Sequence, residues 1–256
     1  MDWVWDEGQE KGLHLVRNQQ TTGKQVVAPA DVENSPLANS PNSTKNKYPN
    51  LASVPYPSGV HFKKVSGANN HQPWQQPSNR TILMSFLGKG RHGDLPVRQK
   101  IVEMCKGYDD DAICYRNKWT ETEGIVGKGK AKFCLEPAGD DPWRKSLSDS
   151  IVFGCIPVLF SELSDDFAPW FWDDWKAKAR IVIPREEFVQ GKIDLKTLLE
   201  SIPNDVLEMM QSTLKEKARR FQYSLDDDPE DALRILLGNV HQRALDLEKS
   251  GKCSFS

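Results

Sequence analysis

The chain has 256 residues, of which 38% are hydrophobic, so it can bury a sizeable core in one large domain or two small ones. Its 34 basic and 36 acidic residues give a net charge of −2, which argues against nonspecific binding to nucleic acid or to an anionic membrane surface. The first residues lack a signal-peptide pattern and no apolar run is long enough to cross a membrane, so we expect neither a leader nor a spanning segment in this chain.

The composition changes near residue 80. Residues 1–79 are rich in Asn, Pro, Ser, Gln and Gly, and we expect them to form loops. From residue 80 onward, apolar runs alternate with helical patterns, which predicts an α/β fold whose parallel sheet carries helices on both faces. The expected strands are residues 81–87, 112–115, 132–135, 156–160 and 179–183, and the expected helices are residues 97–106, 143–153, 193–202, 205–223 and 229–247.

Residues 133–162 read as a strand, a glycine loop, a helix and a second strand. Pro142 suits the first turn of this helix because its missing N–H needs no partner there, and Asp140 or Asp141 can cap the helix. Gly154 is expected to end it in the left-handed conformation. A loop between a strand end and a helix start is where an α/β protein holds a phosphate.

Ligands of such a sheet bind at the carboxyl ends of the strands. Here these are the loops that follow residues 87, 135 and 160. The first of these loops, residues 88–93, has the sequence GKGRHG. Its Arg91 and His92 are within reach of a diphosphate, and a solvated basic turn is the alternative interpretation. The loop matches neither the Walker motif nor the dinucleotide fingerprint.

The second loop combines groups for both parts of a nucleotide diphosphate: donors and cations for the phosphates, and an acceptor for ribose hydroxyls. Asp149 is the expected ribose acceptor. The alternative is an exposed helix carboxylate paired with a basic residue four or five positions earlier. The expected binding residues of this loop and helix are Gly139, Asp140, Arg144, Lys145, Ser146 and Asp149.

Five cysteines show neither the spacing nor the nearby histidine pairs of a zinc site. Cys105 and Cys114 can bridge a short loop if the compartment is oxidising. Cys134 and Cys155 lie in predicted buried strands, and we interpret them as small apolar core residues.

Two aspartate runs, residues 109–111 and 226–228, lie between predicted elements, where caps and solvated turns are the common use. We therefore expect no essential metal. The aromatic run at residues 170–172 is interpreted as packing under a loop, with stacking on a sugar or base as the alternative.

The spacing of residues 133–158 closely resembles the signature of the exostosin-like glycosyltransferases, family 47. The resemblance rests on a long ungapped pattern and extends over residues 50–245, including the segments 54–57, 80–93 and 221–232. The residues that carry the pattern are Phe133, Cys134, Leu135, Pro137, Gly139, Asp140, Pro142, Asp149, Ile151, Gly154, Cys155, Ile156, Pro157 and Val158.

This resemblance implies an inverting hexosyl- or pentosyltransferase of GT-B architecture, with two Rossmann-like domains facing across a cleft. The donor would be a nucleotide sugar, usually a UDP-sugar, and the acceptor a glycan or glycoprotein. Residues 1–79 would then be a loop-rich remnant of the N-terminal acceptor domain with its linker, and residues 80–256 the donor-binding domain. The family also implies a Golgi location, no essential metal or other cofactor, no nucleic-acid partner, and association with related transferases in homo- or hetero-oligomers.

Within the family pattern, Asp149 occupies the position of the acidic residue that serves the nucleotide. The family commonly has an arginine three residues earlier, where this chain has Ser146, so Arg144 or Lys145 would have to replace it, with Arg91 and His92 as the next candidates. No catalytic base can be assigned; His14 and Asp31 are the weak candidates in the first 79 residues. The alternative function is a catalytically inactive or truncated nucleotide-sugar-binding module that acts as the partner of an active relative.

Overall fold

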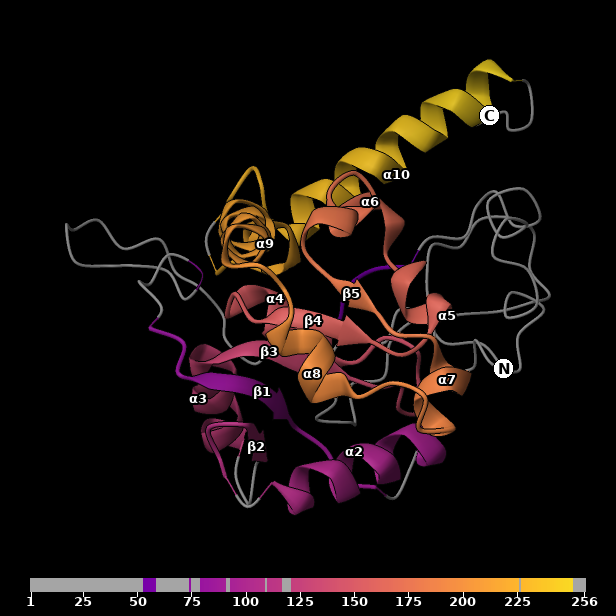
Figure 1. The fold of residues 1–256 in the computed structure, drawn as a ribbon. Coiled ribbons are helices and arrows are strands. Elements are labelled where there is room, and N and C mark those ends of the chain that lie inside the picture. The colour runs from indigo at the N-terminus through magenta and orange to yellow at the C-terminus, as the bar shows by residue number, and fades with distance from the viewer. Residues whose placement is uncertain are drawn as a thin grey trace.

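The computed structural model describes residues 53–58, 74, 79–90, 93–108, 110–116, 121–225 and 227–250. Its centre is a five-stranded, all-parallel sheet in the order β2-β1-β3-β4-β5. The predicted α/β fold is confirmed, because helices surround this sheet (Figure 1). The strands are β1 (Ile82–Phe86), β2 (Cys114–Arg116), β3 (Ala131–Glu136), β4 (Ile156–Leu159) and β5 (Ile181–Val182).

The helices are mostly short, and the last one projects away from the body of the domain toward the C-terminus (Figure 1). Among the described residues, no helix is both long and apolar enough to cross a membrane. The helices are α2 (Leu95–Gly107), α3 (Glu121–Lys130), α4 (Lys145–Val152), α5 (Glu162–Asp165), α6 (Pro169–Trp172), α7 (Arg185–Val189), α8 (Leu195–Glu200), α9 (Asn204–Lys217) and α10 (Ala232–Lys249), with 3₁₀ turns η2 (Lys176–Lys178) and η3 (Ala218–Phe221).

The central strands β3 and β4 are nearly continuous apolar runs, as expected for parallel strands covered on both faces. Every residue of β4 is buried, and in β3 only the second residue is partly exposed. The pairing places Phe133 opposite Ile156 and Leu135 opposite Val158. These two strands therefore form the rigid centre from which the adjoining loops extend.

The start of the central helix differs from the prediction. Helix α4 begins at Lys145, and its N-cap residue Arg144 makes no capping hydrogen bond through its side chain. Pro142 therefore lies in the turn before the helix, and neither Asp140 nor Asp141 is its cap. The Asp141 carboxylate instead accepts a hydrogen bond from the distant hydroxyl of Tyr56, at 2.8 Å, so a tertiary contact replaces the local cap that the sequence favours.

Helix α3 was absent from the prediction. Three of its ten residues are glycines, at positions 124, 127 and 129, and each glycine costs about 1 kcal/mol relative to alanine in a helix interior. One of them has a tertiary role, since a Cβ at Gly127 would lie 2.5 Å from the ring of Tyr115 in β2. Close packing against the sheet thus explains a helix that local propensity argues against.

The aromatic run at residues 170–172 packs in the core, as interpreted from the sequence. Phe171 and Trp172 are buried, and the indole of Trp172 lies 4.9 Å from that of Trp143, edge to face. The Trp143 indole also stacks on Phe221 of η3 at 5.6 Å. This cluster fixes the turn before α4 against the C-terminal helices.

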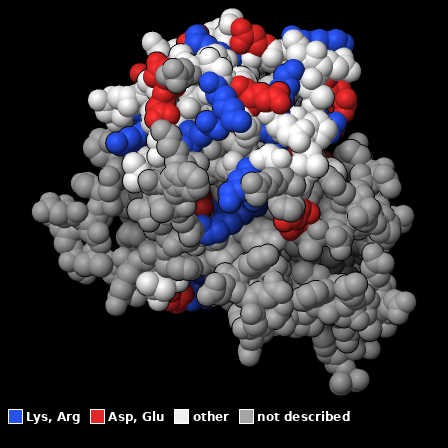
Figure 2. Space-filling view, turned by 90° about the horizontal axis from the view of Figure 1, so that it is seen from below, with Lys and Arg blue, Asp and Glu red and all other residues white. Residues whose placement is uncertain are grey.

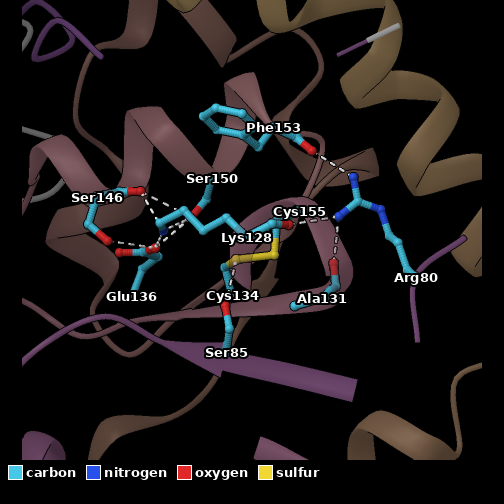
Figure 3. The surroundings of a disulfide bond; sticks show 10 residues. All are labelled: Arg80, Ser85, Lys128, Ala131, Cys134, Glu136, Ser146, Ser150, Phe153 and Cys155. Carbon is cyan, nitrogen blue, oxygen red and sulfur yellow. Dashed lines mark hydrogen bonds and ion pairs between the residues drawn. A yellow bond between two sulfur atoms is a disulfide. The ribbon is translucent and has the colours of Figure 1, made fainter. Parts of the chain in front are cut away.

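Two disulfides cross-link the described region. The bridge between Cys105 and Cys114, which the sequence allows in an oxidising compartment, is present and joins α2 to β2. Cys134 and Cys155 are buried in the core, as interpreted from the sequence. The sequence interpretation missed that they form the second disulfide, which joins β3 to the residue that precedes β4 (Figure 3). Their strands are neighbours in the sheet, and that adjacency brings the two sulfurs together.

Arg80 organises the amino end of the sheet. Its guanidinium donates to the carbonyl oxygens of Lys128 (2.9 Å), Ala131 (2.6 Å) and Phe153 (2.6 Å) (Figure 3). These residues lie in the last turn of α3, at the start of β3 and directly after α4. Burial lowers the pKa of Arg80 to about 10. The neighbouring Gly154 has the predicted left-handed conformation, with φ of 67°. The division of the chain into residues 1–79 and 80–256 stays a prediction.

Candidate functional site

The loops after β1 and β3 meet at the carboxyl edge of the sheet, as the sequence predicts. Gly93, with φ of 74°, lies so close to the second loop that a Cβ on it would be 2.3 Å from Cα of Gly139. The backbone N–H of Asp94 donates to the carbonyl of Ala138 at 3.3 Å. Only a residue without a side chain fits at Gly93, so the two loops form one surface through their backbones.

Two guanidinium groups lie beside this junction. Arg98 of α2 is 3% exposed, packs 5.4 Å over the ring of Phe86, and donates from Nε to the carbonyl of Lys89 at 2.9 Å. Arg144 lies against the second loop, where a Cβ on Gly139 would be 2.5 Å from its Cδ. Burial, together with the charge of Arg144, lowers the pKa of Arg98 to about 10. A concentration of positive charge with little water around it favours an anion.

This charge is local. On the face of the molecule shown in Figure 2, Lys and Arg side chains are interspersed with Asp and Glu over the described residues. The near-neutral composition agrees with this mixture. We therefore look for an anion of limited size, such as a diphosphate, and not for a polymer that needs an extended basic surface.

Asp149 lies one turn into α4 and has features of both sequence interpretations, the buried ribose acceptor and the helix carboxylate paired with a basic residue. Its side chain is 7% exposed, as expected for a binding carboxylate, yet it also pairs with Lys145 at helical spacing, with Nζ 3.1 Å from Oδ2. Oδ1 accepts a hydrogen bond of 2.6 Å from the hydroxyl of Ser58. A ribose would therefore have to share Asp149 with both of these groups, and the ribose role stays a prediction.

A buried polar network lies next to Asp149, between the end of β3 and the start of α4 (Figure 3). The ammonium of Lys128, 1% exposed, lies 2.6 Å from Oε1 of Glu136, which is 6% exposed. It also donates to the carbonyl of Ser146 at 2.8 Å and to the hydroxyl of Ser150. The hydroxyls of Ser146 and Ser150 donate to the same Glu136 oxygen at 3.1 and 2.5 Å.

The segment 53–58 covers the site from the N-terminal side. The Tyr56 hydroxyl donates to Asp141, and burial together with the Asp141 charge raises the pKa of Tyr56. Tyr223 donates from its hydroxyl to the carbonyl of Pro55 at 2.8 Å. These bonds join residues up to 168 positions apart in the chain, so the segment is part of the site's wall.

A further ion pair braces the first loop. Asp94 accepts two hydrogen bonds from Arg185 at the start of α7, from Nε at 2.6 Å and from Nη2 at 2.8 Å. Oδ1 of Asp94 also accepts from the backbone N–H of Val97, at 3.5 Å, so Asp94 caps α2. Bidentate arginine–carboxylate pairs of this kind hold geometry well, so the loop after β1 has a fixed entry into its helix.

The predicted site residues fall into three groups. Gly139, Arg144, Lys145 and Asp149 lie together at the carboxyl edge. Ser146 points into the buried network, and Asp140 is exposed on the turn. Arg91, His92, His14 and Asp31 lie outside the described residues.

The sequence interpretation missed Arg98, Lys128, Glu136, Tyr56 and Ser58. Of these, Glu136 could have been predicted from the sequence, because it is the last residue of a buried strand that leads into the glycine loop. Within the ranges that the structure describes, no group of three or more His, Cys, Asp or Glu side chains could hold a metal ion.

A cavity of about 300 Å³ lies at the opposite, amino edge of the sheet. It is bordered by Arg80, Thr81 and Lys132 from the strand starts and by Leu199, Glu200 and Asn204 from α8 and α9. The carboxyl edge is where parallel α/β sheets place their ligands. The amino-edge cavity is therefore the competing location for any experiment that maps binding.

Comparison with known proteins identifies the family of the chain. The family described as the Exostosin GT47 domain matches residues 14–202. Similar proteins of Arabidopsis thaliana include "Probable xyloglucan galactosyltransferase GT13", 27% identical over 217 residues, which cover 79% of this chain and 45% of that protein. "Probable xyloglucan galactosyltransferase GT12" is 31% identical over 65% of this chain and 34% of its own length. "Xyloglucan galactosyltransferase XLT2" is 26% identical over 77% and 40%. The chain spans less than half of the length of these relatives.

Proposed function

The chain belongs to the exostosin GT47 family, and we propose from this that it transfers a sugar from a UDP-sugar donor to a glycan acceptor with inversion at the anomeric carbon. The names of its relatives make galactose the first sugar to test and xyloglucan the first acceptor. A galacturonosyltransferase specific for xyloglucan is also similar, at 26% identity, so UDP-galacturonate is the second donor to test.

One observation carries the proposal: Arg98 and Arg144 lie beside the junction of two glycine loops at the carboxyl edge of the sheet. The diphosphate of a UDP-sugar carries charge that such a pair can neutralise in a water-poor setting. The start of α4 lies beside the same junction, and its first N–H groups have no side-chain cap. These donors and cations supply what a leaving UDP group needs.

In the proposed reaction, an acceptor hydroxyl oxygen forms a bond to the anomeric carbon while the bond from that carbon to the phosphate oxygen breaks. The electron pair of the broken bond leaves with UDP, where Arg144 and Arg98 stabilise the added negative charge. The proton of the acceptor hydroxyl passes to a general base, for which we assign no residue. Asp149 orients the nucleotide through its ribose, and Arg91 and His92 are further candidates for the phosphates.

Several properties accompany this proposal. The transfer needs no essential metal, because guanidinium groups and helix N–H groups take the role of a cation at the diphosphate. The two disulfides suit an oxidising compartment, in agreement with a Golgi lumenal location. Association with related transferases, as a homo- or hetero-oligomer, is part of the same proposal.

A second candidate function is a donor-binding module that does not catalyse transfer and assists an active relative. The hydrogen bonds of Asp149 to Ser58 and Lys145 favour it, since both carboxylate oxygens already have partners. This module would bind UDP-galactose without transferring galactose, so binding and transfer must be measured separately.

The test is a transfer assay with the purified chain, xyloglucan oligosaccharides and either UDP-galactose or UDP-galacturonate. We expect mass spectrometry to show an added hexose with UDP-galactose or an added hexuronic acid with UDP-galacturonate, and NMR to show a product anomer opposite to that of the donor. The Arg144→Ala variant should lose transfer, whereas Arg219→Ala, which removes a surface ion pair with Glu230, should keep it. Binding of UDP-galactose without any product supports the module, and the absence of both binding and product refutes the donor site.

A further inference from the structure

Glu136 is held in an unusual way for a carboxylate at the end of a strand. It is the last residue of β3, and one of its oxygens, Oε1, accepts from three groups: the Lys128 ammonium and the hydroxyls of Ser146 and Ser150. The donors come from two helices, α3 and α4. This oxygen is therefore saturated, and the side chain has a single orientation.

The other oxygen of the same carboxylate is in a different position. Oε2 makes no hydrogen bond with any residue that the structure describes, although the side chain is only 6% exposed. Figure 3 shows it directed away from the Lys128 ammonium. Oε2 is not among the buried side-chain atoms that lack a partner, so it reaches the surface of this otherwise buried side chain. It is therefore an acceptor that a ligand can approach while Oε1 holds the carboxylate in place.

The surroundings indicate which kind of group would satisfy Oε2. Glu136 lies close enough to Arg98 for its charge to raise the pKa of that guanidinium, so it adjoins the cations at the loop junction. A phosphate is excluded as the direct partner of Oε2, because two anions repel at hydrogen-bond distance. A hydroxyl is the fitting partner, since it can donate to the carboxylate while the diphosphate beside it is held by Arg98 and Arg144.

We propose that Glu136 binds the nucleotide-sugar donor by accepting a hydrogen bond from one of its hydroxyl groups, of either the ribose or the transferred sugar, on Oε2. This inference rests on the proposed function and adds a residue to its site. Lys128 is the positioning residue, because its ammonium holds the Glu136 carboxylate in place and fixes the end of β3 against α4. Both oxygens of Asp149 already accept hydrogen bonds, from Ser58 and Lys145, whereas Glu136 has one oxygen left to accept a bond from the ligand.

The experiment measures binding by calorimetry for wild type, Glu136→Gln and the control Glu200→Gln, with three ligands. These are UDP-galactose, which carries both sets of hydroxyls, UDP, which carries only those of the ribose, and 2′,3′-dideoxy-UDP, which has neither. Glu200 pairs with Lys196 on the surface at the amino edge. The control should bind all three ligands as wild type does.

We expect Glu136→Gln to weaken binding by about 10- to 100-fold for the ligands that carry the hydroxyl, the range for a hydrogen bond to a charged group. A loss for UDP-galactose alone assigns the hydroxyl to the sugar. A loss for UDP-galactose and UDP, but not for dideoxy-UDP, assigns it to the ribose. Unchanged binding, or an equal loss for all three ligands, overturns the inference.

Two further measurements keep the result interpretable. If Glu136→Gln unfolds because it leaves Lys128 as a buried unpaired charge, the double variant Lys128→Met/Glu136→Gln removes both charges and is used in its place. Thermal unfolding of each variant verifies the fold. If wild type binds neither UDP-galactose nor UDP, the proposed function fails; if wild type binds and the variants match it, only the role of Glu136 fails.

Discussion

Replacing Arg80 with alanine should destabilise the domain without touching the carboxyl edge. The guanidinium makes three hydrogen bonds, of 2.6 to 2.9 Å, to the backbone carbonyls of Lys128, Ala131 and Phe153. Bonds to a charged donor contribute about 1.5 to 3 kcal/mol each, so three contribute roughly 5 to 9 kcal/mol. The burial that lowers the pKa of Arg80 to about 10 offsets roughly 3 kcal/mol of this.

The net loss for Arg80→Ala is therefore about 2 to 6 kcal/mol in the free energy of unfolding, with partial rehydration of the carbonyls favouring the lower end. Urea unfolding at 25 °C, followed by tryptophan fluorescence under oxidising conditions, measures it. With a slope of about 2 kcal/mol per molar urea, the midpoint should fall by roughly 1 M or more.

Arg219→Ala is the matched control, because it removes an arginine whose ion pair with Glu230 is exposed and contributes about 1 kcal/mol at most. If Arg80→Ala and Arg219→Ala shift the midpoint equally, Arg80 does not hold the amino end of the sheet together. The reasoning from its three bonds would then be wrong.

Three other changes test separate parts of the structure. Gly154→Val should lower the free energy of unfolding by about 1 to 3 kcal/mol or more, because a β-branched residue is strained at φ of 67°; a midpoint in urea equal to that of wild type would refute this. The double variant Cys134→Ala/Cys155→Ala should lose roughly 3 kcal/mol, as expected for a loop of this length, and a reductant should then have less effect on its melting temperature than on that of wild type. Arg144→Ala should weaken UDP binding by about 10-fold in calorimetry and should lose more affinity in low salt than in high salt, because the lost contact is between opposite charges; equal affinity for wild type and variant in low salt would show that Arg144 does not contact the diphosphate.

The sheet was readable from the sequence because its strands are apolar runs bounded by glycine and proline. The runs at 81–87, 132–135 and 156–160 became β1, β3 and β4 with shifts of only a few residues. Helix α3 was not readable, because its three glycines weaken the helical pattern and the sheet supplies the stabilisation. Helix α3 therefore forms because of its tertiary packing and not because of its local sequence.

The site could be predicted from the sequence only where its residues are close together in the chain. Gly139, Arg144 and Asp149 lie within one loop and one helix, and local pattern brought them together. The pairing of Lys128 with Glu136 and of Ser58 with Asp149 depends on how α3 and the segment 53–58 pack against α4. The disulfide between Cys134 and Cys155 depends in the same way on which strands are neighbours.

Hydrogen–deuterium exchange with and without UDP-galactose tests the central claim most directly, because it locates the ligand on the sheet. We expect slower exchange in peptides that span residues 136–149, where the end of β3, the glycine loop and the first turn of α4 adjoin the guanidinium pair. Peptides that span residues 199–207, beside the amino-edge cavity, should not change. Protection of residues 199–207 with no change in residues 136–149 would contradict the assignment of the donor site to the carboxyl edge.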